Sequence, residues 1–252
     1  MSPSTAGFPP INEVFAADEN NRRQVAESMG DSVLALPKDV AGLYHQHYEA
    51  VRHSFSNKPA TFAGLLYVSC CQSLTMAVMS LLRRYSSQAF RETRVAVETA
   101  GIAHEITKND ESFEVFLADR GDIQCRRVAR NRFQAKTLFR DGAAALTAAY
   151  YKASELSHQN RRSLITHVNS TAGMYTFQDL PDHAIPLVAT NHLLCICFTH
   201  MTILQVADSV FPDIENEALL AFRKERQFVG ERLARFHQAN QQDIADSTHA
   251  NK

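Results

Sequence analysis

Two long segments without a charged side chain constrain the fold of this chain more than any other feature. Residues 59–82 and residues 184–207 contain no Asp, Glu, Lys or Arg. Each is long enough to cross a bilayer, but both carry polar side chains that are costly in lipid, among them Gln72 and Asn191. Helices that are apolar on every side are also expected at the centre of a bundle, where other helices surround them. We therefore expect two interior helices of a soluble protein and no membrane span.

The rest of the chain also has a helical pattern. Apolar residues recur at intervals of three and four almost throughout, and alternation with a period of two is nowhere sustained. Nine glycines in 252 residues are few for a protein rich in turns. The sequence therefore predicts an all-α fold, a single helical bundle of seven to nine helices with disordered termini and little or no sheet.

Prolines, glycines and asparagines suggest the boundaries. We expect a flexible N-terminal segment over residues 1–36 with a short helix near 11–28, a bundle domain over 37–239, and a disordered tail over 240–252. Pro37 is expected to be the first residue of a helix, where its missing N–H is not needed. Expected helices of the bundle lie at about 37–55, 60–84, 88–107, 111–119, 122–139, 143–158, 187–209 and 213–238. A short extended piece is expected in TAGMYTF, residues 171–177.

Charge and cysteine content narrow the classes of function. The 26 basic residues nearly cancel the 27 acidic ones, so no global field attracts nucleic acid or an anionic membrane. The five cysteines are odd in number and lack the spacing of a disulfide framework, and no signal segment is recognised at the start. These features indicate a reducing compartment and predict a cytoplasmic protein.

The most informative polar residues lie on two of the expected helices. Arg94 and Glu98 are four residues apart, which places them on one helix face among apolar neighbours. Tyr151, Ser154 and His158 are spaced by three and four on a later helix. If the two helices pack together, these side chains form one polar network inside the bundle. Such a network either fixes the register of the helices or lines a pocket for a ligand or partner.

These residues resemble a pattern found in a group of bacterial all-helical proteins of unknown function. The pattern is an apolar helix, then R-x3-E, then a segment rich in aromatic residues, then Y-x2-S-x3-H. It is matched here by Arg94 with Glu98, by Phe113 with Phe116, and by the residues from Tyr151 to His158. The resemblance covers about residues 40–210. It implies a helical bundle with a shared pocket and no established activity.

A second resemblance concerns RRSLITH, in which Arg162 precedes His167 with four residues between them. This is similar to the R-x4-6-H signature of HEPN ribonucleases, helical proteins of prokaryotic defence and toxin systems. A histidine can move the proton of a ribose hydroxyl, and an arginine can stabilise the charged phosphate. The resemblance implies Arg162 and His167 as catalytic residues and a dimer that brings two such signatures together. Ser163 stands where the family more often has Asn, Asp or His.

A basic stretch offers a surface for RNA. Its positive residues are Arg126, Arg127, Arg130, Arg132, Lys136 and Arg140. Such a patch can contact phosphates, although most basic helix faces are simply solvated and Asp119, Asp122 and Asp141 reduce the local charge. RNA binding is therefore an alternative hypothesis that belongs with the nuclease.

The sequence favours neither a metal nor a cofactor. The pair Glu155 and His158 is a single E-x-x-H motif, whereas ferritin-like di-iron bundles use two. Cys195 and Cys197 are two residues apart, so on a helix they point to different sides and do not form a zinc site with His192 and His200. No phosphate-binding glycine loop, nucleophile elbow or dinucleotide fingerprint occurs.

Three classes of function remain open. The leading hypothesis is a helical protein whose polar network binds a small ligand or partner, and whether it is an enzyme stays undecided. The alternatives are a HEPN-like ribonuclease and a structural protein that forms a homodimer. Apolar residues of the last helix are candidates for that dimer surface: Ile214, Leu219, Phe222, Phe228, Leu233 and Phe236.

Overall fold

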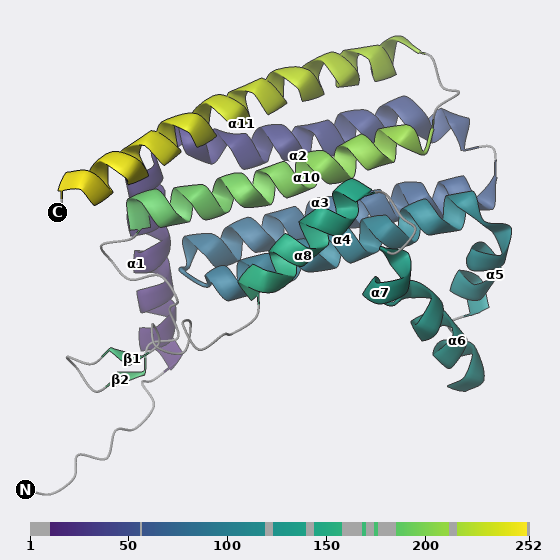
Figure 1. Ribbon diagram of the computed structural model, residues 1–252, viewed down its shortest axis with the longest axis horizontal. Helices are drawn as coiled ribbons and strands as arrows, with labels where there is room; N and C mark the ends of the chain where they lie inside the picture. The colour runs from purple at the N-terminus through teal and green to yellow at the C-terminus, as the bar shows by residue number, and fades with distance from the viewer. Residues whose placement is uncertain are drawn as a thin grey trace, which may run out of the picture.

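A computed structural model describes residues 11–55, 57–118, 123–139, 144–157, 168–169, 174–175, 185–211 and 216–250. The described chain is almost entirely helical, and its long helices run side by side along the long axis of the molecule (Figure 1). The expectation of a single all-α helical bundle is confirmed. The elements are α1 (Ile11–Met29), α2 (Asp31–Val51), η1 (Arg52–Ser54), α3 (Lys58–Leu82), α4 (Ser86–Lys108), α5 (Asp110–Ala118), α6 (Ile123–Phe133), α7 (Ala135–Leu138), α8 (Ala144–Ser157), β1 (Val168–Asn169), β2 (Met174–Tyr175), η3 (Ile185–Ala189), α10 (Thr190–Ser209) and α11 (Glu217–Ala250).

Helix α10 lies at the centre of the bundle. It packs against α2, α3, α4, α8 and α11, which surround it on most sides (Figure 1). Its leucines and isoleucines are fully buried, and they point in several directions around the helix: Leu193, Leu194, Ile196, Ile203 and Leu204. This explains why the segment carries no charge, because a charge at almost any of these positions would be buried without a partner.

Helix α3 is the other uncharged helix, and its environment differs from that of α10. One face packs on α4, α2 and α10 through residues such as Tyr67, Cys70 and Leu74, which are buried. Only 33% of its most apolar stretch is buried, compared with 50% for the stretch ending at Ser209. By length and composition both helices are able to cross a membrane, which alone is weak evidence for a membrane protein. The outer face of α3 is therefore both apolar and exposed.

Two asparagines cap the N-termini of helices. The side chain of Asn57 accepts a hydrogen bond of 2.9 Å from the backbone N–H of Ala60 at the start of α3. Asn109 accepts one of 3.0 Å from Glu111 at the start of α5. Each side chain satisfies a donor that the first turn of a helix leaves free. The breaks predicted between the helices at 37–55 and 60–84, and between those at 88–107 and 111–119, are confirmed.

Three boundaries differ from the prediction. Pro37 does not begin a helix, because α2 starts at Asp31 and continues through it, with Leu36 and Val40 buried on the same helix. The predicted basic helix at 122–139 is divided into α6 and α7, since Gln134 has extended backbone angles. Helix α11 passes its predicted end at 238, and Asn240 donates to the Leu187 carbonyl at 3.4 Å, which anchors the extension on the bundle. The strand β2, paired antiparallel with β1, lies within the predicted extended piece.

Gly64 of α3 permits a close approach of the chain that follows α2. A Cβ built at this position would meet the ring of Phe55 directly, with Cε1 and Cε2 at 3.1 Å. That ring packs between Tyr48 and Phe211, so it has little room to move. Gly42 of α2 is a matched contrast, since a Cβ there would have nothing within 4 Å.

We therefore expect Gly64→Ala to lower the free energy of unfolding by roughly 1 kcal/mol or more, because overpacking costs more than the gain in helix propensity. Gly42→Ala should raise it by about 0.5–1 kcal/mol, because alanine loses less backbone entropy than glycine in a helix. Urea unfolding followed by circular dichroism measures both. Equal shifts of the two variants would contradict the packing argument.

Candidate functional site

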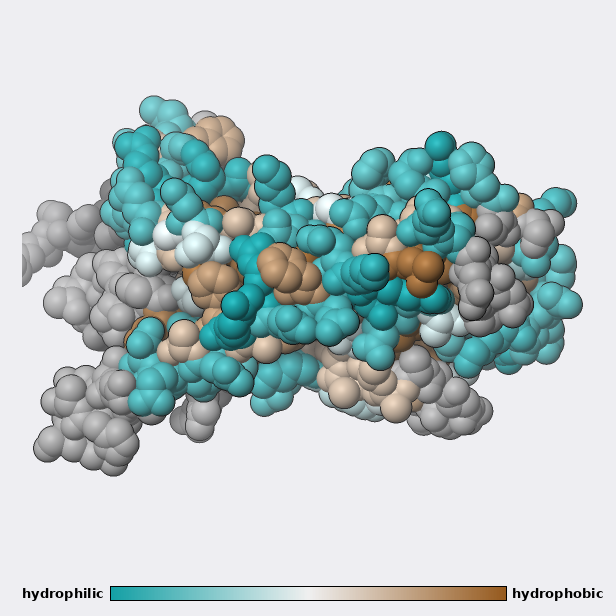
Figure 2. Space-filling view, turned by 90° about the horizontal axis from the view of Figure 1, so that it is seen from above, coloured by the Kyte–Doolittle hydropathy of each residue, from teal (hydrophilic) through white to brown (hydrophobic). Residues whose placement is uncertain are grey.

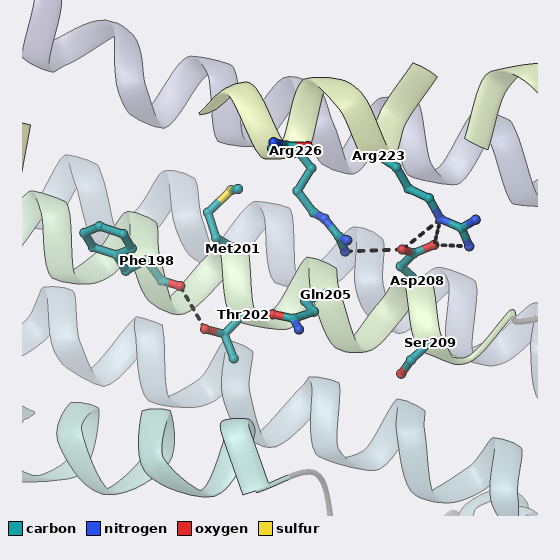
Figure 3. A pocket seen from close by; sticks show the side chains of 9 residues that line it. Phe198, Met201, Thr202, Gln205, Asp208, Ser209, Arg223 and Arg226 are labelled. Carbon is teal, nitrogen blue, oxygen red and sulfur yellow. Dashed lines mark hydrogen bonds and ion pairs between the residues drawn. The ribbon is translucent and has the colours of Figure 1, made fainter. Parts of the chain in front are cut away.

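A groove of about 980 Å³ lies along α10 and α11 (Figure 3). Helix α10 supplies its floor and α11 supplies one wall. The lining residues of α10 follow one face of the helix at intervals of one, three or four: Phe198, Met201, Thr202, Gln205, Asp208 and Ser209. Those of α11 are Arg223, Arg226 and Gln227. A groove of this size is within the range of sites for small molecules.

A charged cluster forms one end of the groove (Figure 3). The Asp208 side chain, only 10% exposed, receives Arg223 Nη2 at 3.0 Å and Arg226 Nη1 at 3.4 Å. Arg223 Nε also lies 3.1 Å from both carboxylate oxygens. Two guanidinium groups thus share one carboxylate, and the three side chains together carry one positive charge in excess.

Arg226 is held in position by more than its ion pair. Its Nη1 donates to the Leu204 carbonyl at 3.5 Å, and its guanidinium carbon lies 5.5 Å from the centre of the Phe222 ring. Phe222 is fully buried. Because the arginine is fixed from several sides, its charge is directed at the groove in a defined place.

The other end of the groove is less polar. Phe198 and Met201 present their side chains there, while the Thr202 hydroxyl donates to the Phe198 carbonyl at 3.1 Å (Figure 3). The hydroxyl group of Thr202 therefore donates its hydrogen bond within α10 and not to the groove. The groove combines a positive end with an apolar end, which suits a molecule that has both an anionic group and an apolar body.

A buried polar cluster lies in the core beside this groove. It consists of Tyr44 and His47 on α2, Tyr67 and Cys70 on α3, and His200 on α10, all buried. The Tyr44 hydroxyl and His200 Nδ1 share a hydrogen bond of 2.9 Å. His47 lies against the rings of Tyr67 and Phe222, with centroids 6.5 and 5.0 Å away. Three helices thus meet through polar groups in an otherwise apolar interior.

Burial makes the histidines of this cluster neutral. Burial lowers the pKa of His200 to about 3. It lowers the pKa of His47 to about 4, opposed by the nearby Asp208 carboxylate and reinforced by Arg226. Within the described residues, His47 Nε2, His200 Nε2 and the Tyr67 hydroxyl find no hydrogen-bond partner. Burial therefore disfavours a charge on either ring, and for His47 the Asp208 carboxylate offsets only part of this cost.

The two helices of the predicted polar network are neighbours. Helices α4 and α8 pack against each other, and Arg94 Nε lies 3.5 Å from Glu98 Oε1. The Ser154 hydroxyl on α8 is buried without a hydrogen-bond partner among the described residues, whereas Tyr151 is exposed. His158 lies outside the described residues, so a network that includes it stays a prediction.

The structure describes only some of the residues of the nuclease hypothesis. Arg162 and His167 are outside the described residues, as is Arg140. Of the basic stretch, Arg126, Arg127 and Arg130 are exposed on α6, but Arg132 is bound to Glu105 at 3.1 Å and to the Ser112 hydroxyl at 2.8 Å. Arg132 therefore joins α6 to α4 and α5, and the catalytic pair stays a prediction.

His192 and Cys197, for which the sequence favours no zinc site, lie in different environments. His192 Nδ1 lies 3.1 Å from the Ser86 hydroxyl, and Cys197 is buried. The parts of the chain that the structure describes contain no group of three or more His, Cys, Asp or Glu arranged to hold a metal ion.

The last helix contributes mainly to the core. Leu219, Phe222 and Leu233 are fully buried, whereas Phe228 is 50% exposed; Ile214 lies outside the described residues. Seen from above, the face that carries α11 is hydrophilic over most of its described area, with hydrophobic groups in separate patches (Figure 2). The proposed dimer surface on this helix is therefore used largely for packing.

The charged cluster was not predicted from the sequence. Asp208 was visible as the first charged residue after the uncharged segment 184–207, and Arg223 and Arg226 are three residues apart on the next helix. That spacing puts both arginines on one face, which was the available signal. Comparison of the chain with protein-family models, curated proteins and solved structures found no match. The site is therefore interpreted from its geometry alone.

The buried histidine predicts a pH dependence of stability. In the unfolded chain His47 binds a proton with the ordinary histidine pKa of 6.5, whereas in the folded protein its pKa is about 4. The contribution of neutral His47 to the free energy of unfolding is therefore fully present above pH 6.5 and is lost as the pH falls from 6.5 toward 4. In His47→Phe this part of the loss should be absent, so its free energy of unfolding should fall less over the same range. Urea unfolding at several pH values measures the difference, and parallel curves would contradict the assignment.

Proposed function

We propose that this protein binds a small anionic molecule with an apolar body in the groove between α10 and α11. The observation that carries the proposal is the pair Arg223 and Arg226 around the single carboxylate of Asp208, at one end of a groove of about 980 Å³. The excess positive charge is partly shielded from water, which strengthens its attraction for an anion.

The chemistry of arginine narrows the anionic group. A guanidinium is planar and presents donors in a fork that matches a carboxylate or a phosphate. Phe198 and Met201 then offer a surface for an aromatic or aliphatic body. The ligand class supported by the groove is thus an organic carboxylate or phosphate ester rather than a neutral molecule.

The same three side chains also join α10 to α11, and this alone would be a reason for the cluster. Arg223 and Arg226 belong to α11, while Asp208 belongs to α10. A purely structural cluster and a binding cluster differ in one respect: only the second distinguishes an anion from a neutral molecule of the same shape.

Phenyl phosphate and benzoate should therefore raise the melting temperature of the protein, whereas benzyl alcohol at the same concentration should not. In Arg223→Gln the anions should bind at least about 10-fold more weakly, because a charge-assisted hydrogen bond contributes about 1.5–3 kcal/mol. Lys224→Gln is the matched control, since it removes the same charge from the exposed neighbouring position. Thermal shift and calorimetric titration measure both effects. Equal responses to the anions and the alcohol would reject the proposal.

A second variant distinguishes a binding role of the cluster from a purely structural one, because it should change anion affinity and stability in opposite directions. Asp208→Asn removes the carboxylate that competes for the two guanidinium groups, so phenyl phosphate should bind several-fold more tightly. The same variant should lower the melting temperature, because two arginines lose their partner. Calorimetric titration gives the affinity. Weaker or unchanged binding together with lower stability would show that the cluster only holds the helices together.

A further inference from the structure

The exposed face of α3 is a continuous stripe without charge. Its residues recur at intervals of three and four along the helix: Leu65, Val68, Gln72, Met76 and Met79. The four apolar members are all exposed to solvent, and Leu65 is 54% exposed. A surface helix normally carries charged residues on its outer face, so this stripe of α3 resembles the seam of a helix pair that lacks its second helix.

A shallow groove lies beside one end of the stripe. It has a volume of about 450 Å³ and separates α2 from α3. Leu65, Val68 and Cys71 line it on one side, and the other side consists of residues of α2: Ala41, Tyr44, His45, Tyr48 and Glu49. Most of this lining is apolar. Flexible, unbranched side chains such as methionine are suited to fill irregular grooves of this kind.

From this stripe we infer that α3 is the contact surface of a homodimer, in which the α3 helices of two copies lie antiparallel about a two-fold axis at Gln72. The axis pairs positions equally far from residue 72, so Leu65 meets Met79 of the second copy and Val68 meets its Met76. The methionines of each copy then lie over the groove of the other. Symmetry makes the arrangement close on itself, as isologous interfaces do.

Gln72 at the axis supports this arrangement. A side-chain amide is both a donor and an acceptor, so two copies related by a two-fold axis can bond to each other. A polar residue at the centre of an apolar seam fixes the register of the two helices. The stripe itself carries no charge, and Glu49 in the groove is paired with Arg52 at 2.8 Å, so a second copy can cover this face without leaving that carboxylate unpaired.

The available area also suits a dimer. An axis at Gln72 overlaps residues 62–82 of the two α3 helices, which gives a length of about 30 Å at 1.5 Å per residue. With the flanks of α2 and α4 at helix spacings of about 8–10 Å, the face is about 20 Å wide and offers roughly 600 Å². This is the lower end of the range of about 600–1,000 Å² per partner for a specific interface.

A lipid surface is a less suitable occupant. Helices that lie on membranes usually combine an apolar face with Lys or Arg at its borders and with Trp or Phe as anchors. The stripe contains none of these residues, and the whole chain has no Trp. Gln72 would also be costly in lipid without a partner.

Sedimentation velocity of the full chain tests the inference, which does not depend on the ligand groove. The wild-type protein should sediment at micromolar concentration as a dimer of its 28.2 kDa chain. Leu65→Glu should give a folded monomer. Leu220→Glu is the matched control, because Leu220 of α11 is 52% exposed, nearly the same as Leu65, and should leave the dimer intact. Circular dichroism checks the folding of each variant.

A cross-linking experiment gives a second readout that does not require a destabilising change. Gln72→Cys should form a covalent dimer under mild oxidation, whereas Lys224→Cys and the wild-type protein should not. The inference is overturned by a monomeric wild-type protein at 100-fold higher concentration, or by a dimer that Leu220→Glu dissociates and Leu65→Glu does not. It is also overturned if the protein is a monomer that floats with phosphatidylcholine and phosphatidylserine vesicles through this stripe.

Discussion

The burial of α10 is the constraint on which the rest of the structure depends. This helix is long and nearly uncharged, and its leucine and isoleucine side chains are fully buried against α2, α3, α4, α8 and α11. Removing that surface from water is the main favourable contribution to folding. The surrounding helices pack as they do because each has one apolar face to bury and α10 offers apolar surface in nearly every direction.

The candidate site lies at the surface where α10 and α11 meet. One face of α10, from Phe198 to Ser209, lines the groove together with residues of α11. Asp208 stands near the end of α10, within reach of α11, so the first charge after the uncharged segment meets two arginines. The position of Asp208 in the bundle therefore places the charged cluster at one end of the groove.

The polar groups in the interior beside the groove are neutral, in contrast to the charged cluster at its end. Tyr44, His47 and His200 are buried, and burial lowers the pKa of both histidines to values at which they are neutral near pH 7. Asp208 attracts a proton to His47 while Arg226 repels it, so the two charges partly offset each other at the ring. Charged side chains thus lie at one end of the groove, whereas the buried polar cluster beside the groove is neutral. This agrees with the high cost of burying a charge.

The two uncharged segments illustrate the difference between similar sequences in different places. Both were predicted as interior helices, yet α10 is central, whereas α3 leaves the stripe from Leu65 to Met79 exposed. Apolar composition shows that a surface is suited to burial. It does not show whether the same chain or another copy provides the covering surface, because that depends on which helices are packed beside it.

The sequence by itself determined the helical class, most helix positions and the local pairs. The spacing of Arg94 and Glu98, and the asparagines at the helix starts, were readable because these effects operate within one or two turns. Only the tertiary structure decided that Tyr44 meets His200 and that Asp208 meets Arg223 and Arg226. Periodicity tells which face of a helix is buried, but the neighbour on that face is set by how all the helices pack around α10, and no spacing along one segment contains that information.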